Sequence, residues 1–230
     1  MAAQTQPSAP PPATSDGQLV FFRNVVAGDY GLLRLEAGGE AVYLNFNRIN
    51  QLLELRSGLL DPAETAEIHA LLDASGLENL EPFYDYQASG ELAVEHTYYW
   101  LRYAAQGQQP VLVGFHIQVL PDQLRPLLVR LEMLPKRLDV QTVSGAYLLA
   151  GEAQLLNTKR YIESRITLAT GRLQEYPILA RSLAEPYRLL SLSAKDQTAV
   201  ESVLNPAAST LEVEQEGMLQ TIILLQAASP

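Results

Sequence analysis

Three histidines are the first candidates for metal binding or proton transfer, because imidazole ligates zinc and titrates near neutral pH. They are His69, His96 and His116. His69 lies within an expected helix, where a solvated side chain is typical. His96 and His116 lie on two strands expected to pair as a hairpin, and pairing of residue 100 with residue 116 offsets the two histidines by about four residues. This offset is too large for joint coordination, so we predict no metal site.

Acidic side chains are plentiful, but their spacing does not indicate a catalytic pair. Glu36 and Glu40 flank an expected hairpin turn, while Glu212, Glu214 and Glu216 alternate along one strand, where a solvated polar face is expected. Acid–base catalysis needs two carboxyl groups in one cleft whose environments separate their pKa values. No nucleophile elbow, zinc-binding HExxH helix or glycine-rich phosphate loop occurs either. We therefore predict a non-catalytic protein with no cofactor.

Aromatic residues gather in one part of the chain and are its most distinctive feature. On the expected strand, Tyr98 and Trp100 share one face, whereas Tyr99 and Tyr103 share the other. Tyr and Trp are favoured at interfaces because they bury a large area and keep a polar tip. We predict that these four residues form a surface for a protein partner. The alternative is that both faces are covered, one by the helix that starts at Asp61 and the other by the C-terminal half. The full group is Phe83, Tyr84, Tyr86, Tyr98, Tyr99, Trp100 and Tyr103.

Composition excludes several classes of protein. The chain has 230 residues, of which 47% are hydrophobic, and it has no cysteine, which excludes disulfide scaffolds, thiolate metal sites and thiol catalysis. Its formal net charge of -10 argues against a nucleic-acid partner, because binding to phosphate needs a basic surface. No apolar run approaches the ~20 residues that a membrane-spanning helix needs. Another protein is the expected partner.

The elements expected around these residues indicate an α+β fold of antiparallel sheets with a few covering helices. Residues 19–23, 30–36 and 41–46 are β-rich, and a glycine pair at 38–39 suits a tight turn in this antiparallel meander. Asp61, Pro62 and Glu64 carry three signals for a helix start, and Gly76 is a stop signal. Two long strands at 91–104 and 111–120 and a helix that ends at Met133 follow. In the C-terminal half we expect strands at 145–156, 187–192, 210–215 and 218–226, with helices at 176–183 and 194–204.

The chain divides into a tail and two small adjacent domains. Residues 1–18 are rich in Pro, Ala, Ser and Thr and are expected to form a disordered tether. Residues 19–134 form the expected N-terminal α+β domain, and residues 135–230 form the expected C-terminal α+β domain. The tail leaves two locations open: an extracytoplasmic one, secreted or lipid-tethered after processing, and a cytoplasmic one.

The order of elements in residues 19–134 resembles the emfourin type of small bacterial protease inhibitor. The matching segments are the capped helix at LLDPAETAEIHALL, the strands around HTYYWLRY and VLVGFHIQVL, and the closing helix at LPDQLRPLLVRLEML. The resemblance implies a protein partner, with a protease as one form, bound by a surface loop or a strand end. No inhibitory residue of that family can be aligned with this chain. The chain also differs from the single-domain form of the family, because it carries a tail and a C-terminal half.

These observations lead to two hypotheses. The preferred one is a non-catalytic protein-interaction module, with inhibition of an exported hydrolase as its specific form. The alternative is a binding or carrier protein for a small amphipathic ligand held between the two domains. Exposed Tyr99 and Trp100 on a flat surface would favour the first hypothesis, and a deep apolar cavity would favour the second. A pocket that joins His116 with two carboxylates would instead favour a hydrolase.

Overall fold

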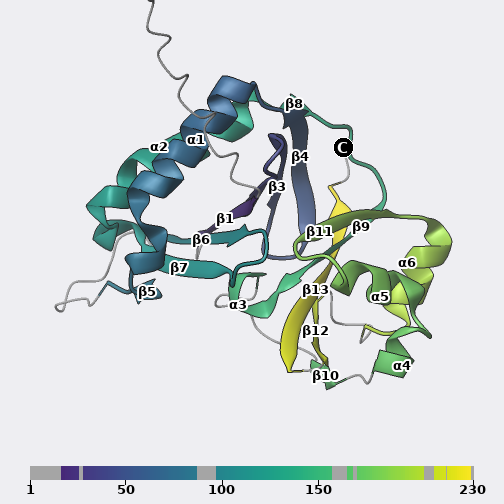
Figure 1. The fold of residues 1–230 in the computed structure, drawn as a ribbon. Helices are drawn as coiled ribbons and strands as arrows, with labels where there is room; N and C mark the ends of the chain where they lie inside the picture. Colours follow the sequence, from purple (N-terminus) through teal and green to yellow (C-terminus); the bar gives the residue numbers. More distant parts are fainter. Residues whose placement is uncertain are drawn as a thin grey trace, which may run out of the picture.

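The computed structural model describes residues 17–25, 28–86, 97–156, 165–167, 170–204, 210–215 and 217–228. Thirteen described strands form one mixed sheet, with helices on its outer sides, which confirms an α+β fold (Figure 1). The predicted tail, apart from its last two residues, lies outside the described part of the chain. None of the described helices has the length and apolar character needed to cross a membrane.

The N-terminal half begins with the predicted antiparallel meander, which is confirmed. Its three strands are β1 (Gly17–Val25), β2 (Tyr30–Leu35) and β3 (Glu40–Phe46), and β4 (Gln51–Leu59) adds a fourth strand that pairs with β3. β6 (Thr97–Ala105) pairs antiparallel with β1, so β1 lies in the middle of this part of the sheet. β7 (Val111–His116) pairs with β6, and the short β5 (Phe83–Tyr84) runs parallel to β7.

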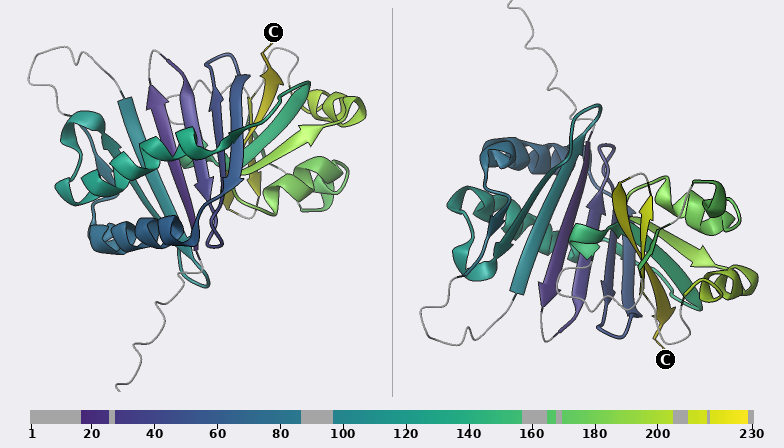
Figure 2. Two further views of the ribbon diagram at one scale, coloured as in Figure 1. Left: turned by 90° about the horizontal axis from the view of Figure 1, so that it is seen from above. Right: turned by 90° about the horizontal axis from the view of Figure 1, so that it is seen from below.

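Two helices cover one face of these strands (Figure 2). α1 (Pro62–Ser75) starts where predicted, because the Asp61 side chain accepts a hydrogen bond from the backbone N–H of Ala63 at 2.8 Å. It ends at Gly76, whose φ of 56° is the left-handed conformation that favours glycine. α2 (Arg125–Met133) follows a 3-10 turn at Asp122–Leu124. Leu33, Phe115 and Leu127 belong to the core between the helices and the sheet.

The hairpin of β6 and β7 differs from the prediction in two ways. Tyr98, not residue 100, lies opposite His116, so the predicted register is wrong by two residues. β7 ends at His116, and the chain continues as a 3-10 turn at Ile117–Val119, so the predicted strand to residue 120 is too long. The expected strand start at residues 91–96, which includes His96, lies outside the described residues.

The C-terminal half adds a second group of strands in the order β11-β9-β13-β12-β10. β9 is Ala146–Glu152, β10 is Arg165–Thr167, β11 is Arg188–Leu192, β12 is Thr210–Gln215 and β13 is Met218–Ala227. The helices are α3 (Ala153–Leu156), α4 (Thr170–Leu173), α5 (Pro177–Leu183) and α6 (Ala194–Glu201). The expected strand at 145–156 is therefore too long, because the chain turns into α3 after Glu152.

The two halves are joined by strand pairing and by a shared core. β13 pairs in parallel with the first residues of β4, and the short β8 (Asp139–Val140) pairs with β4 further along. A second core, named here the junction core, lies on the face of the N-terminal strands opposite α1 and α2. It includes Phe22 and Trp100 from the N-terminal half and Leu149, Tyr187 and Ile223 from the C-terminal half. The predicted division near residue 135 thus crosses a continuous sheet, and independent folding of each half stays a prediction.

Candidate functional site

The aromatic strand predicted as a partner surface is buried. Tyr98, Tyr99 and Trp100 are only 7%, 5% and 7% exposed, and Tyr103 packs partly buried against the core under α1 and α2. The physical reason is the position of β6, which has neighbouring strands on both sides and packed layers on both faces. The expected exposure of these side chains is therefore wrong, and the structure matches the alternative in which both faces are covered.

The aromatic side chains at this end of the sheet pack against one another. Phe83, 42% exposed, stacks on Trp100 with ring centroids 5.4 Å apart and on Tyr98 with centroids 6.2 Å apart. Gly114 makes this packing possible, because a Cβ at that position would lie 2.6 Å from the Trp100 ring. The group is thus a closed stack rather than an open cage for a ligand.

The two described histidines, His69 and His116, lie within packed parts of the fold. His116 is buried; its Nδ1 accepts a hydrogen bond from the backbone N–H of Gln118 at 3.3 Å, and its ring packs against Tyr86 and Tyr98. His69 lies partly buried on α1, and burial lowers its pKa. Within the described residues, no group of three or more His, Asp or Glu side chains is placed to hold a metal ion.

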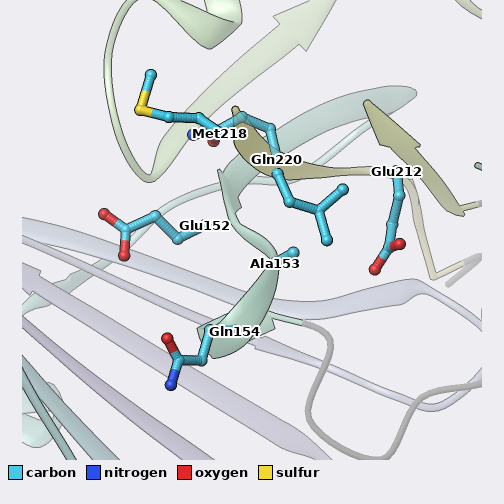
Figure 3. Close-up of a pocket in the computed structure, with 7 residues that line it drawn as sticks. Glu152, Ala153, Gln154, Glu212, Met218 and Gln220 are labelled. Carbon is cyan, nitrogen blue, oxygen red and sulfur yellow. The ribbon is translucent and has the colours of Figure 1, made fainter. Parts of the chain in front are cut away.

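A hollow of about 470 Å³ opens where the end of β9 meets the start of β13 (Figure 3). β9 ends at Glu152, and the turn into α3 brings Ala153 and Gln154 to the same wall. β12 and β13 supply the opposite wall. We name this hollow the polar chamber, and its lining is Glu152, Ala153, Gln154, Glu212, Met218, Leu219 and Gln220.

A second hollow of about 340 Å³ adjoins the first, since both are lined by Met218 and Gln220. Its walls come from α4, α5 and the region just after α5, together with the β12–β13 hairpin. We name it the apolar chamber, because aliphatic side chains predominate in its lining of Leu173, Gln174, Ala180, Leu183, Ala184, Gln215, Met218 and Gln220. The two chambers together are called the β13 groove below.

A partly buried ion pair fixes the wall of the polar chamber. Arg102, on β6, donates from Nε to Oε1 of Glu152 at 2.9 Å, and its Nη2 lies 2.7 Å from the same oxygen. The Arg102 side chain is 7% exposed and that of Glu152 is 30% exposed. Arg102 does not line the groove. It holds Glu152 in place from β6, in the N-terminal half of the sheet.

Tyr187 completes this arrangement. Its ring lies 5.2 Å from the Arg102 guanidinium carbon, and its carbonyl oxygen accepts a hydrogen bond from Arg34 at 2.8 Å. Tyr187 has a φ of 51°, a conformation that non-glycine residues rarely adopt. Burial, reinforced by the Glu152 carboxylate, raises the pKa of the Tyr187 hydroxyl far above its ordinary value. Tyr187 is therefore a neutral, rigid part of the junction.

The carboxylates of the polar chamber are not arranged for acid–base catalysis. Figure 3 shows Glu152 and Glu212 on opposite sides of Ala153, with their carboxylates not facing each other. His116 does not line the chamber, so this hollow does not join His116 with the two carboxylates. Among the described residues that line the chamber, the charged ones are Glu152 and Glu212.

Sequence reasoning missed this groove. Glu212 was expected on a solvated strand face, but it is 1% exposed, so that expectation is wrong for Glu212, although Glu214 is exposed. Leu211 and Val213 alternate with Glu212 in the sequence, which indicates a strand with one apolar face and one acidic face. This pattern does not show that the acidic face is also covered by other residues. Which side chains line the groove depends on the contact between β9, α3 and the β12–β13 hairpin, and no local motif marks that contact.

Comparison with known proteins adds no family: no protein-family model matches the chain, and no curated protein matches it. The resemblance to emfourins therefore stays a prediction.

Proposed function

We propose that this chain is a non-catalytic binding protein for a small amphipathic ligand held in the β13 groove. The observation that carries this proposal is the junction of two unlike chambers, one with carboxylates and one with aliphatic walls, at Met218 and Gln220. Ligand sites are typically concave spaces of about 300–1,000 Å³ with an apolar lining and a few polar groups. Each chamber falls within that range. A ligand with a polar head and a short aliphatic tail fits this division.

The rigid back wall supports binding rather than turnover. Arg102 and Tyr187 fix Glu152 before any ligand arrives, which lowers the ordering cost of binding. The carboxylates of the chamber do not face each other, and the described histidines are engaged elsewhere in the fold. These features support a site that holds its ligand without changing it.

Methyl NMR of methionine tests the proposal directly. The chain has three methionines, and two of them report on distant surfaces: Met218 lies in the groove, whereas Met133 is exposed on α2. Titration with 1-octanol is expected to shift the Met218 methyl signal in a saturable manner and to leave Met133 unchanged. Equal shifts at both methyl groups, or none at Met218, would refute binding in the groove.

A variant that fills the apolar chamber tests the site of binding, and the same substitution on α1 provides the matched control. Ala184 is exposed and lines the apolar chamber, so Ala184→Phe is expected to occupy the tail site and remove the saturable shift of Met218. Ala66 is exposed on α1, and Ala66→Phe makes the same change far from the groove. Binding should survive in the Ala66 variant. Loss in both variants would show that the effect is not local to the groove.

A second candidate function, a protein-interaction module, is supported by the edge of β11. β11 pairs with β9 on one side, and among the described residues no strand pairs with its other side. Such an edge can accept an extended segment of another protein as an added strand. The half-buried side chains of Leu189, Leu190 and Leu192 would supply apolar contacts. Inhibition of an exported hydrolase, which the emfourin resemblance implies, would be one form of this pairing.

Site-specific photo-crosslinking in the native host tests this second candidate. A photoreactive amino acid at position 191, an exposed residue of β11, is expected to yield one discrete adduct with another protein. The same amino acid at position 202, exposed at the end of α6, serves as the control and should yield none. Absence of an adduct at 191, or the same adducts at both positions, would count against the β11 edge.

A further inference from the structure

We propose that Met218 is a reversible oxidation site, at which a peroxide converts the thioether to a sulfoxide and closes the β13 groove to its ligand. This proposal rests on the proposed function and adds a means of regulating the same site. Met218 lines both the polar and the apolar chamber, so a chemical change in this one side chain alters both chambers at once.

The Met218 side chain is open to a small oxidant in solution. The residue is 62% exposed at the start of β13, directly after Gly217 in the turn of the β12–β13 hairpin. Figure 3 shows the side chain extended from the strand, with the sulfur near its outer end. The fold therefore does not have to open before this thioether meets hydrogen peroxide, and exposure of the sulfur favours its oxidation.

The reaction transfers one oxygen atom and two electrons. A lone pair of the Met218 sulfur attacks one oxygen of hydrogen peroxide, the O–O bond breaks, and the second oxygen leaves as water with both protons. The sulfur is oxidised to a sulfoxide, and the peroxide is reduced. The chain has no cysteine, so no thiol of its own competes for the peroxide. A thiol-dependent sulfoxide reductase reverses the change, because two thiols are oxidised to a disulfide while the oxygen leaves as water.

A second exposed methionine differs from Met218 in the surroundings of its sulfur. Met133, on α2, is 49% exposed, and the ammonium Nζ of Lys136 lies 4.0 Å from its sulfur and donates a weak hydrogen bond to it. This contact engages a sulfur lone pair, and the nearby positive charge makes that sulfur a poorer nucleophile. Met218 makes no such contact with any described residue. Peroxide should therefore oxidise Met218 before Met133, and Lys136→Gln should narrow the difference.

A sulfoxide at position 218 opposes binding because it places a polar group along the path of an aliphatic tail. Leu173 and Leu183 supply aliphatic walls to the apolar chamber, and Met218 adds a flexible thioether to the same lining. Oxidation makes this side chain polar, and contact of the S=O group with a ligand tail removes water from it without a replacing hydrogen bond. The same opposition works in reverse, so a bound ligand should protect Met218 from peroxide.

Two measurements on the full chain test the proposal: peptide mass analysis follows each methionine after peroxide treatment, and isothermal titration calorimetry measures 1-octanol binding. Treatment is expected to weaken binding by about tenfold, in step with oxidation of Met218. Saturating 1-octanol should slow the oxidation of Met218 and leave that of Met133 unchanged. Oxidation of Met133 first, or equal protection of both residues, would contradict the assignment.

Leucine variants locate the effect at one thioether. Met218→Leu keeps an apolar side chain of similar volume that peroxide does not oxidise, so its binding of 1-octanol should be the same before and after treatment. Met133→Leu makes the matched change on α2 and should still lose binding on treatment. If the Met218 variant also loses binding, the oxidation that matters is elsewhere and the proposal is overturned.

The outcomes separate this proposal from the function on which it rests. If the untreated chain does not bind 1-octanol, the proposed function is wrong, and the switch is wrong with it. If the untreated chain binds and binding survives complete oxidation of Met218, the groove stands but the switch is wrong. Loss of binding that follows Met218 oxidation and is restored by a sulfoxide reductase would support both.

Discussion

Replacing Glu152 with Gln is expected to lower the free energy of unfolding by about 2 kcal/mol. Removal of one partner from a fully buried ion pair costs about 3–5 kcal/mol, because the other charge is left buried without compensation. Here Arg102 is 7% exposed, but Glu152 is 30% exposed, and glutamine retains one oxygen as an acceptor. Partial access of water and this remaining acceptor reduce the cost below the range for a fully buried pair.

A double-mutant cycle isolates the interaction itself. Arg102→Met leaves Glu152 partly open to water, so its cost should be about 1.5 kcal/mol, the lower end for a lost hydrogen bond to a charged group. The double variant removes both charges, and its destabilisation should be smaller than the sum of the single changes by at least about 1 kcal/mol. The exposed pair of Asp122 and Arg125, at 3.2 Å, provides the control cycle, with an expected coupling of no more than about 0.5 kcal/mol.

Urea unfolding followed by tryptophan fluorescence measures these differences. Trp100 is the only tryptophan, and it lies in the junction core with Tyr187, so its emission reports on the region that the substitution perturbs. The reasoning would be refuted if Glu152→Gln cost less than about 0.5 kcal/mol, or if its coupling to Arg102 equalled that of the Asp122 control pair. An unchanged urea dependence of the free energy would confirm that all variants unfold from the same compact state.

Three further predictions concern the junction and α1. Tyr187→Phe is expected to change stability by no more than about 1 kcal/mol in urea unfolding, because the buried hydroxyl interacts with the Glu152 carboxylate but not with good hydrogen-bond geometry; a larger loss would contradict this. Burial lowers the pKa of His69 below its ordinary 6.5, against the opposing charge of Asp73, so the unfolded chain binds the proton at a higher pH than the folded protein. Stability should therefore fall as the pH decreases below 6.5, and His69→Gln should make that fall smaller when urea midpoints are compared across the range. Because the junction core joins both halves, Trp100 fluorescence and far-ultraviolet circular dichroism should follow a single shared unfolding curve, whereas two separate transitions would indicate independent domains.

The parts of the fold that follow from local chemistry could be predicted from the sequence. The start of α1 depends on Asp61 and Pro62, and its end depends on Gly76, all within one or two residues of the atoms that they cap. The hairpin of β2 and β3 turns at Gly39, whose φ of 91° suits glycine. Each of these features needs only a few neighbouring residues, so the sequence pattern is sufficient.

The parts that depend on distant contacts could not be predicted in the same way. The alternation of Tyr98 and Trp100 against Tyr99 correctly divides the β6 side chains between two faces, but it does not say what covers each face. The register of β6 against β7 was wrong by two residues because it depends on the form of the turn. Tyr187 has a left-handed conformation, and its contacts with Arg34 and Arg102 come from parts of the chain that are far away in the sequence.

β6 carries aromatic side chains on both of its faces, and its packing helps to position one wall of the β13 groove. A strand with large apolar side chains on both faces is typical of a central position with layers on both sides, and β6 occupies that position. Arg102 lies two residues after Trp100 and therefore on the same face, which is the one covered by the C-terminal half. A buried guanidinium there requires an anionic partner from that half, and Glu152 supplies it. The packing of the N-terminal sheet thus fixes the end of β9, and with it one wall of the β13 groove.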